Sequence, residues 1–334
     1  SDVCSSDLDV LSGMQDLVRS CAERLGDLRG LRVLDIGCND GSLLDAFQAR
    51  GALTAGIEPT GAATEAARRH FVIQDYFGVH CVPAVLSRFG VPDVITFTNV
   101  FAHIEDLGGL LEALRQLAGP QTLLVIENHY LGSILLRNQF DTFYHEHPRT
   151  YSARSFVRIA GLLAMDLVDV QFPARYGGNI RVFMGGTTPP RDGFADALSA
   201  ILAGESQFGD GLRSLQQRME RWKNETSFML GELVARHGPL RAKAFPGRAA
   251  ILLALLGVDR ESIEAVHEKP GSMKIGCYVP GTRIPIRCDR ELLDGPHPPV
   301  LINLAWHIAT EIRGYLQANG YRGEVIDILD ETTP

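Results

Sequence analysis

The chain has 334 residues, of which 45% are hydrophobic and 22% are charged, and its formal net charge is −8. This composition allows two domains with cores of their own, and the acidic balance argues against a broad nucleic-acid-binding surface. No apolar run approaches the roughly 20 residues of a membrane-spanning helix, so no membrane partner is expected. The 6 cysteines form no C-x-x-C pair. We therefore expect neither a zinc site nor disulfides, and reduced thiols favour a cytoplasmic location.

The first eight residues differ in character from the rest of the chain. Residues 1–8 read SDVCSSDL, without an initiator Met or a secretory pattern, and we expect them to be a non-native leader. Residues 9–28 place apolar side chains at helical spacing and predict an amphipathic helix that leads into the first strand.

An apolar run, a glycine-rich turn and a helical pattern follow one another over residues 31–44. We expect a buried parallel strand, a tight turn and a helix that begins near Ser42. Glycine lets a ligand approach the backbone, and the helix start directs unpaired N–H groups toward it. The D-x-G-x-N-x-G spacing matches the first motif of class I S-adenosylmethionine (SAM) methyltransferases, although a glycine turn also serves geometry alone. The residues that we assign to cofactor binding here are Asp35, Gly37, Asn39 and Gly41.

The second predicted strand, residues 53–59, ends in an acid. Glu58 can accept hydrogen bonds from both ribose hydroxyls of a nucleoside, so Glu58 and Pro59 join the cofactor residues, although the same acid would serve NAD. A helix over 60–70 and a short strand over 71–73 follow. Asp75 then suits an adenine amino group, with Tyr76 or Phe77 against the ring, while the alternative for Asp75 is a helix N-cap.

Two further strands are predicted over 92–100 and 121–127, with a helix over 107–117 between them. The repeated alternation of strand and helix indicates a doubly wound, mostly parallel sheet. The first of these strands brings three more cofactor candidates to the edge where Gly37 lies: Asn99, Val100 and His103. The second delivers two substrate candidates, Asn128 and Tyr130.

Residues 163–170 and 179–184 predict an antiparallel pair that closes the sheet and borders the pocket. Three residues on or before these strands are assigned to the acceptor: Tyr176, Asn179 and Arg181. For Arg181 a surface position is the alternative.

The chain divides into a SAM-binding domain over 9–190, a helical connector over 191–238 and a smaller Rossmann-like α/β domain over 239–334. In the connector, 206–237 predicts one long helix. The last domain alternates predicted strands and helices: strands over 242–245, 263–267, 300–304 and 324–328, and helices over 248–256 and 306–319. Its first turn places Pro246 where a phosphate cradle needs a backbone donor, so no dinucleotide is expected there.

Histidine, glutamate and tyrosine gather between residues 140 and 152, beyond the fifth strand. A histidine titrates near neutrality and accepts protons, and Glu146 can orient or tune it. Three interpretations are open: a structural histidine cluster, a metal site, and a proton-transfer site. The metal site would use His129, His145 and His147, but the carboxylate–histidine spacing typical of a metal helix is absent.

Five segments then occur in a fixed order: residues 37–44, 56–59, 144–152, 176–181 and 274–286. Together they resemble the SAM-dependent C-methyltransferases that act on nucleotide-linked keto-deoxysugars. The resemblance covers about residues 9–330. It implies a class I methyltransferase fold, SAM as cofactor, no metal, and a sugar nucleotide as the small-molecule substrate.

The same resemblance implies roles for the motif Tyr144-His145-Glu146-His147. A base removes the proton beside the sugar's C4 ketone, and the enolate takes the methyl group of SAM. His147 is then the base, Tyr144 a donor to the enolate oxygen, and Glu146 a residue that holds substrate or orients His147.

Three features depart from that family. This sequence has no counterpart of the N-terminal zinc module with its paired C-x-x-C. The turn over 245–250 and the pair Trp306-His307 differ from the usual residues, which bears on the acceptor. Three other functions stay open: an O- or N-methyltransferase, an NAD-dependent oxidoreductase, and a non-catalytic remnant that binds SAM or a sugar nucleotide.

Overall fold

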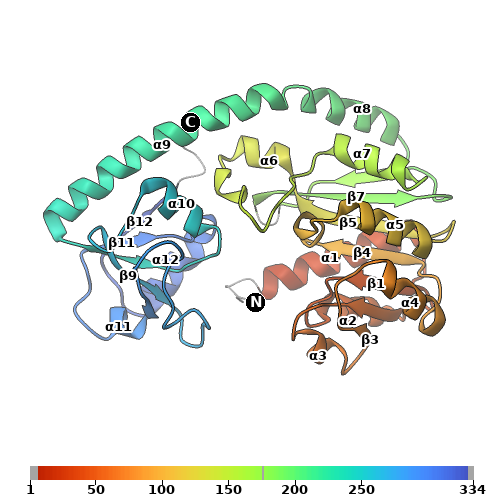
Figure 1. Ribbon diagram of the computed structural model, residues 1–334, viewed down its shortest axis with the longest axis horizontal. Coiled ribbons are helices and arrows are strands. Elements are labelled where there is room, and N and C mark those ends of the chain that lie inside the picture. The colour runs from red at the N-terminus through yellow and green to blue at the C-terminus, as the bar shows by residue number, and fades with distance from the viewer. Residues whose placement is uncertain (1–6, 175–176, 330–334) are drawn as a thin grey trace. The chain divides into compact units, whose positions relative to one another are not determined.

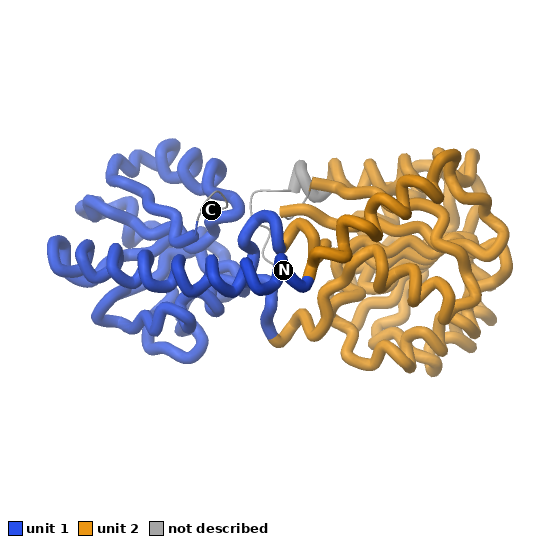
Figure 2. The backbone as a smooth tube through the Cα atoms, turned by 90° about the horizontal axis from the view of Figure 1, so that it is seen from above, with its two compact units in different colours: residues 1–5, 135–144, 209–334 blue, residues 6–134, 145–208 orange. Residues whose placement is uncertain are grey.

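The computed structural model describes residues 7–174 and 177–329. The chain forms two compact units (Figure 2): unit 2 contains residues 6–134 and 145–208, and unit 1 contains residues 135–144 and 209–334. The division after Phe208 falls inside the segment predicted to be a connector. The division around 135–144 was not predicted, because that segment lies within the predicted SAM-binding domain.

Unit 2 is built on a seven-stranded sheet in the order β3-β2-β1-β4-β5-β7-β6 (Figure 1). Its strands are β1 Arg32–Ile36, β2 Leu53–Ile57, β3 Phe71–Ile73, β4 Val94–Thr98, β5 Leu123–His129, β6 Asp166–Gln171 and β7 Asn179–Gly185. All neighbours pair in parallel except β7, which runs antiparallel to both β5 and β6. The predicted sheet and its antiparallel closing pair are therefore confirmed.

Helices cover both faces of this sheet, because successive strand residues point to opposite faces. Leu34 faces a core that includes α4, α5 and α7, whereas Val33 faces a core shared with α1 and α2. Burial of both faces explains why the strands read as nearly continuous apolar runs. The helices are α1 Asp7–Leu25, α2 Ser42–Gln48, α3 Ala63–Ala66, α4 Val82–Arg88, α5 Leu107–Leu117, α6 Leu131–Leu136, α7 Ala153–Leu162 and α8 Phe194–Glu205.

Helix α7 was not predicted, although the sequence carries a start signal for it. Ser152 is its N-cap: the hydroxyl accepts the N–H of Ser155, and the Ser155 hydroxyl accepts the N–H of Ser152 at 2.8 Å. Glu205 accepts the next two free N–H groups, those of Ala153 and Arg154, at 2.6 and 2.9 Å. A carboxylate at a helix N-terminus is stabilised in this way.

Unit 1 is built on a five-stranded parallel sheet in the order β10-β9-β8-β11-β12, which is a Rossmann-like arrangement. Its strands are β8 Leu240–Lys243, β9 Ile263–Glu268, β10 Ile286–Cys288, β11 Val300–Asn303 and β12 Glu324–Asp327. Its helices are α9 Phe208–His237, α10 Ala249–Leu256, α11 Arg290–Leu293 and α12 Ala309–Ala318, with the short 3-10 turns η3 Phe140–Thr142 and η5 Trp306–Ile308. Strand β10 was not predicted; the other four were.

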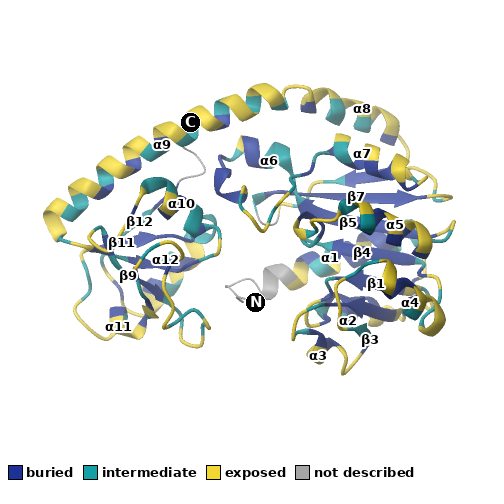
Figure 3. Ribbon diagram, viewed as in Figure 1, coloured by how far each residue is buried: buried dark blue, intermediate teal, exposed yellow. Residues whose placement is uncertain are grey.

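The long helix α9 is mostly exposed (Figure 3) and buries four side chains, Leu215, Trp222, Thr226 and Leu230. Across the described ranges, no helix is both long and apolar enough to cross a membrane.

Candidate active site

The predicted glycine turn lies at the carboxyl end of β1, and two of its glycines have no substitute. Gly37 and Gly41 have φ angles of 76° and 88°. A Cβ on Gly37 would lie 2.4 Å from a methyl group of Val100, and one on Gly41 would lie 3.0 Å from the ring of His70. Asn39, between them, also has a left-handed φ of 50°. The turn is therefore tightly packed against Val100, just beyond β4, and α2 begins directly after the turn.

Glu58 ties this turn to the one after β2. The side chain is only 6% exposed. One carboxylate oxygen accepts the N–H of Asn39 at 3.0 Å and the other accepts the N–H of Thr60 at 2.9 Å. A carboxylate offers about four lone-pair sites, so both oxygens keep capacity for ribose hydroxyls. Pro59 continues the same turn.

Asp35 is a buried carboxyl group at the same edge, 3% exposed, and it accepts the hydroxyl of Thr96 at 2.6 Å. Burial raises its pKa to about 7; the Thr96 hydrogen bond opposes this rise, and the negative charge of Glu58 adds to it. Within the described ranges no cation forms an ion pair with Asp35, so its ionised form lacks a positive partner there. A ligand that combines a ribose with cationic groups, as SAM does, fits Glu58 and Asp35 together.

Asp75 and Tyr76 follow β3 and are both exposed, with Asp75 accepting the N–H of Tyr76 at 2.8 Å. The N-cap alternative for Asp75 is wrong, because Gly78 and Cys81 occupy the cap positions of the next two helical segments. Contact of these residues with adenine stays a prediction.

The structure brings candidate metal ligands together after β3, whereas the metal site considered from the sequence used three histidines. In the described part of the chain, the group that brings three such atoms within 4.8 Å of one another is Asp75, His80 and Cys81, not the three histidines considered above. The Cys81 thiol donates to the carbonyl of Tyr76 at 3.4 Å, and burial raises its pKa, which disfavours the thiolate that a metal needs.

His147 lies among other imidazoles. Its ring centroid is 4.7 Å from that of His103, which follows β4, and 5.5 Å from that of His129, at the end of β5. The structure packs His103 against the candidate base, and its predicted contact with the cofactor stays a prediction. Glu146 is exposed on the same loop, whose Arg149 donates to the carbonyl of Ile104 at 2.8 Å. Tyr144 is half-buried and belongs to unit 1.

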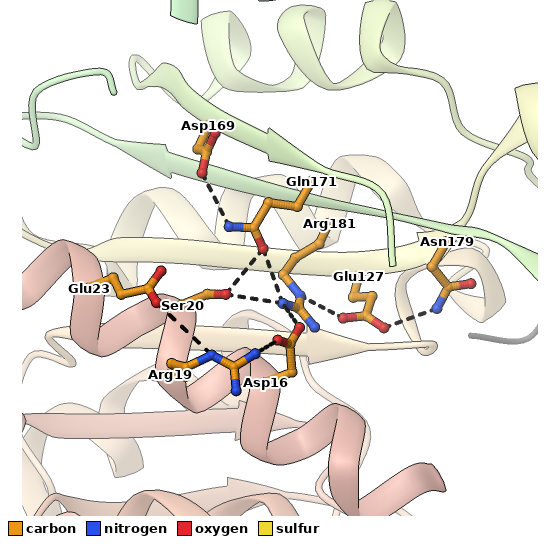
Figure 4. Close-up of polar contacts among 9 residues, drawn as sticks. All are labelled: Asp16, Arg19, Ser20, Glu23, Glu127, Asp169, Gln171, Asn179 and Arg181. Carbon is orange, nitrogen blue, oxygen red and sulfur yellow. Dashed lines mark hydrogen bonds and ion pairs between the residues drawn. The ribbon is translucent and has the colours of Figure 1, made fainter. Parts of the chain in front are cut away.

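Arg181 lies at the centre of a buried polar network on β5 and β7 (Figure 4). The side chain has no exposed surface, so the surface alternative for this residue is wrong. Its Nε donates to Glu127 at 2.7 Å, and Nη1 donates to Asp16 of α1 at 2.9 Å. Ser20 of α1 and Gln171 of β6 accept from the same Nη1 at 3.3 and 3.1 Å.

Asn179 extends the network toward β4. Its amide donates to Glu127 at 3.1 Å and to Asn99 at 3.2 Å, and Asn99 has a left-handed φ of 54°. Glu127 was not among the predicted site residues. A charge at the end of an otherwise apolar strand is the signal that would have found it.

Some buried polar atoms on β5 and β7 have no hydrogen-bond partner within the described ranges, among them Asn128 Nδ2, Asn179 Oδ1 and Arg181 Nη2. Such a group costs about 1–3 kcal/mol unless water or a ligand meets it. Tyr130, by contrast, donates its hydroxyl to Glu205 at 3.1 Å, so the contact it makes here is structural. Contacts of Asn128, Tyr130, Asn179 and Arg181 with an acceptor stay predictions, and Tyr176 lies outside the described residues.

The strand order with an antiparallel β7, the glycine turn after β1 and the acid after β2 define a class I SAM-dependent methyltransferase. Residues 10–162 match the family model of a methyltransferase domain, and residues 174–326 match that of a C-methyltransferase C-terminal domain. The chain is therefore a SAM-dependent methyltransferase that carries a C-methyltransferase C-terminal domain, and SAM is its cofactor. The oxidoreductase alternative is wrong.

The chain is similar to several known methyltransferases. The chain is 28% identical to C-methyltransferase NovU of Streptomyces niveus over 323 residues, which cover 93% of this chain and 74% of that protein. It is 33% identical to a ubiquinone biosynthesis O-methyltransferase of Rhodopseudomonas palustris over 109 residues, 31% of this chain and 42% of that protein. A solved magnesium protoporphyrin IX methyltransferase of Synechocystis, with bound SAH, aligns with a TM-score of 0.42 and 20% identity over 55% of this chain and 88% of that one.

Proposed function

We propose that this enzyme C-methylates a nucleotide-linked keto-deoxysugar through an enolate that the protein generates by general-base catalysis. The observation that carries the proposal is the position of His147, whose imidazole packs against those of His103 and His129 beyond β4 and β5. The match to a C-methyltransferase C-terminal domain and the likeness to NovU support carbon as the methylated atom. The motifs shared with the keto-deoxysugar enzymes support the acceptor class.

The chemistry of the proposal assigns one task to each residue. His147 accepts the proton from the carbon beside the ketone, and the electron pair of that C–H bond moves onto the ketone oxygen. Tyr144 donates a hydrogen bond to that oxygen, and Glu146 binds the sugar or orients His147. Asp35 and Glu58 hold the cofactor. SAM, when bound, supplies the methyl group that the enolate carbon takes.

The test is the variant His147→Ala. We expect normal folding and SAM binding, with methyl transfer reduced about 10²–10⁴-fold, because a general base contributes that much. The variant should also fail to exchange the acceptor's α-proton for deuterium when SAM is replaced by its demethylated product. That exchange measures deprotonation without methyl transfer. The matched control is His145→Ala, an exposed neighbour on the same loop, which should exchange like the wild type.

Two further measurements separate the alternatives. Product NMR shows a new C–CH₃ group if the proposal holds, and an O–CH₃ or N–CH₃ group if the acceptor atom is different. A chelator that abolishes wild-type activity would favour a metal site. A stable His147→Ala that exchanges the proton at the wild-type rate would place the base elsewhere.

A further inference from the structure

The segment 135–144 belongs to unit 1, although it lies between two stretches of unit 2 in the sequence (Figure 2). Arg218 of α9 donates to the carbonyl of Leu135 at 2.8 Å and also bonds to the side chain of Asn138. The ring of Phe140 packs on Trp222 with 4.9 Å between centroids. This segment is therefore fixed to unit 1 just before it enters the Tyr144-His145-Glu146-His147 motif.

Asp141 is the strongest of these anchors. Its side chain has no exposed surface. Arg248 Nε donates to Oδ2 at 2.8 Å, Arg248 Nη2 bonds to Oδ1, and Trp306 Nε1 donates to Oδ2 at 2.8 Å. The guanidinium also lies 5.0 Å from the Trp306 ring, and it contacts the Thr142 hydroxyl at 3.3 Å.

Two distant segments of unit 1 meet at this carboxylate. Arg248 lies in the turn after β8, and Trp306, in η5, directly precedes His307. The pKa of His307 is lowered to about 4, mainly by burial and secondly by the nearby positive charge of Arg248. His307 is thus neutral at physiological pH and does not compete with Arg248 for Asp141.

Such an anchor fixes position as well as charge. A buried carboxylate is stable only while its hydrogen bonds are made, and a two-point arginine contact sets its orientation. Tyr144 follows Asp141 by three residues, a span of at most ~10 Å. The backbone of Tyr144 is therefore held within a short radius of a fixed point on unit 1.

We propose that Asp141 is a positioning residue, which places Tyr144 through its contacts with Arg248 and Trp306. The inference rests on the proposed function, in which Tyr144 meets the enolate oxygen. It assigns Asp141, Arg248 and Trp306 a share in catalysis without contact with the reacting atoms. Displacement of a catalytic group by about 1 Å can cost on the order of 10²-fold in rate.

The experiment uses Asp141→Asn in the full chain. We expect faster hydrogen–deuterium exchange in peptides covering 137–146, an unchanged SAM affinity, and a kcat lowered about 10–10²-fold on a nucleotide-linked 4-keto-deoxysugar. The matched control is Asp289→Asn. Asp289 is another acid of unit 1, 1% exposed, which accepts from Lys243 and Tyr315 at 2.8 Å each. That variant should lower stability but leave both the 137–146 exchange and kcat unchanged.

A second variant keeps the proposal testable if Asp141→Asn does not fold. Trp306→Phe removes one hydrogen bond to Asp141 and keeps a ring, so it should change exchange and kcat in the same direction by less. The double variant Asp141→Asn/Arg248→Gln should be no worse than Asp141→Asn, because both changes break one interaction.

Unchanged exchange, or faster exchange with an unchanged kcat, overturns the positioning role. A wild type that neither methylates the keto-sugars nor exchanges their α-protons overturns the proposed function instead.

Discussion

At the carboxyl end of β1, the charge state of Asp35 links cofactor binding to pH. A carboxyl group whose pKa is about 7 in the folded protein, against 3.8 as its ordinary value, binds more protons when folded than when unfolded. In the protein without SAM, stability therefore falls as pH rises from about 4 to about 7. A cationic ligand favours the ionised form, so it binds better above that range.

We predict that SAM affinity rises between pH 5 and pH 8 in the wild type, by at most about tenfold per pH unit, because one proton is released. Asp35→Asn should bind SAM more weakly, with a flatter pH profile. Calorimetry across this range measures both. Equal pH profiles for the two proteins would show that Asp35 does not face the cationic part of the cofactor. Asp40→Asn, an exposed acid of the same turn, is the control.

The sequence predicts where single residues lie along the chain better than it predicts contacts between distant residues. The positions of Gly37 and Glu58 follow from local chain order, since each comes directly after a strand that its own neighbours define. The contact of His103 with His147 joins residues that lie far apart in the sequence, and only the folded sheet edge brings them together. The local sequence pattern therefore could not predict this contact.

Among the elements, β7 buries two polar side chains, Asn179 and Arg181. Its antiparallel register places Arg181 directly opposite Glu127 on β5, and both side chains are fully buried. The sequence predicted an antiparallel closing pair but not its register, so it left Arg181 at either an acceptor or a surface position. A shift of one residue would have sent this arginine to the other face of the sheet.

We predict that Arg181→Met destabilises unit 2 by about 3–5 kcal/mol, because Glu127 would keep a buried charge without its main partner. Arg181→Met/Glu127→Gln should recover much of that loss. Both tryptophans, Trp222 and Trp306, lie in unit 1, so the measurement is hydrogen exchange of β5 and β7 peptides in urea rather than fluorescence. Arg68→Met, which removes an exposed pair with Glu65, should change stability by less than about 1 kcal/mol. A double variant as unstable as the single one would contradict this account.

On the scale of the whole molecule, the two sheets were predictable but the division of the chain between them was not. Each sheet follows from the alternation of apolar strands and amphipathic helices. The segment 135–144 joins unit 1 through Asp141, whose partners Arg248 and Trp306 are separated from it by 107 and 165 positions. No local pattern predicts an ion pair over such distances.

The first turn of unit 1, after β8, differs from the glycine turn of unit 2, so we expect the two units to bind different ligands. After β8, Ala244 has a φ of 63°, the N–H of Phe245 is bound by the carboxylate of Glu268, and Pro246 has no N–H. A diphosphate needs free backbone donors and no adjacent negative charge.

We predict that unit 1 binds neither NAD nor NADP. Titration calorimetry of the full chain should show no saturable heat with either dinucleotide, while SAM titrated into the same sample demonstrates a competent protein. A dinucleotide found at the β8 turn in a crystal would refute the prediction, and Glu268→Gln should not create such a site, because Pro246 still withholds a donor.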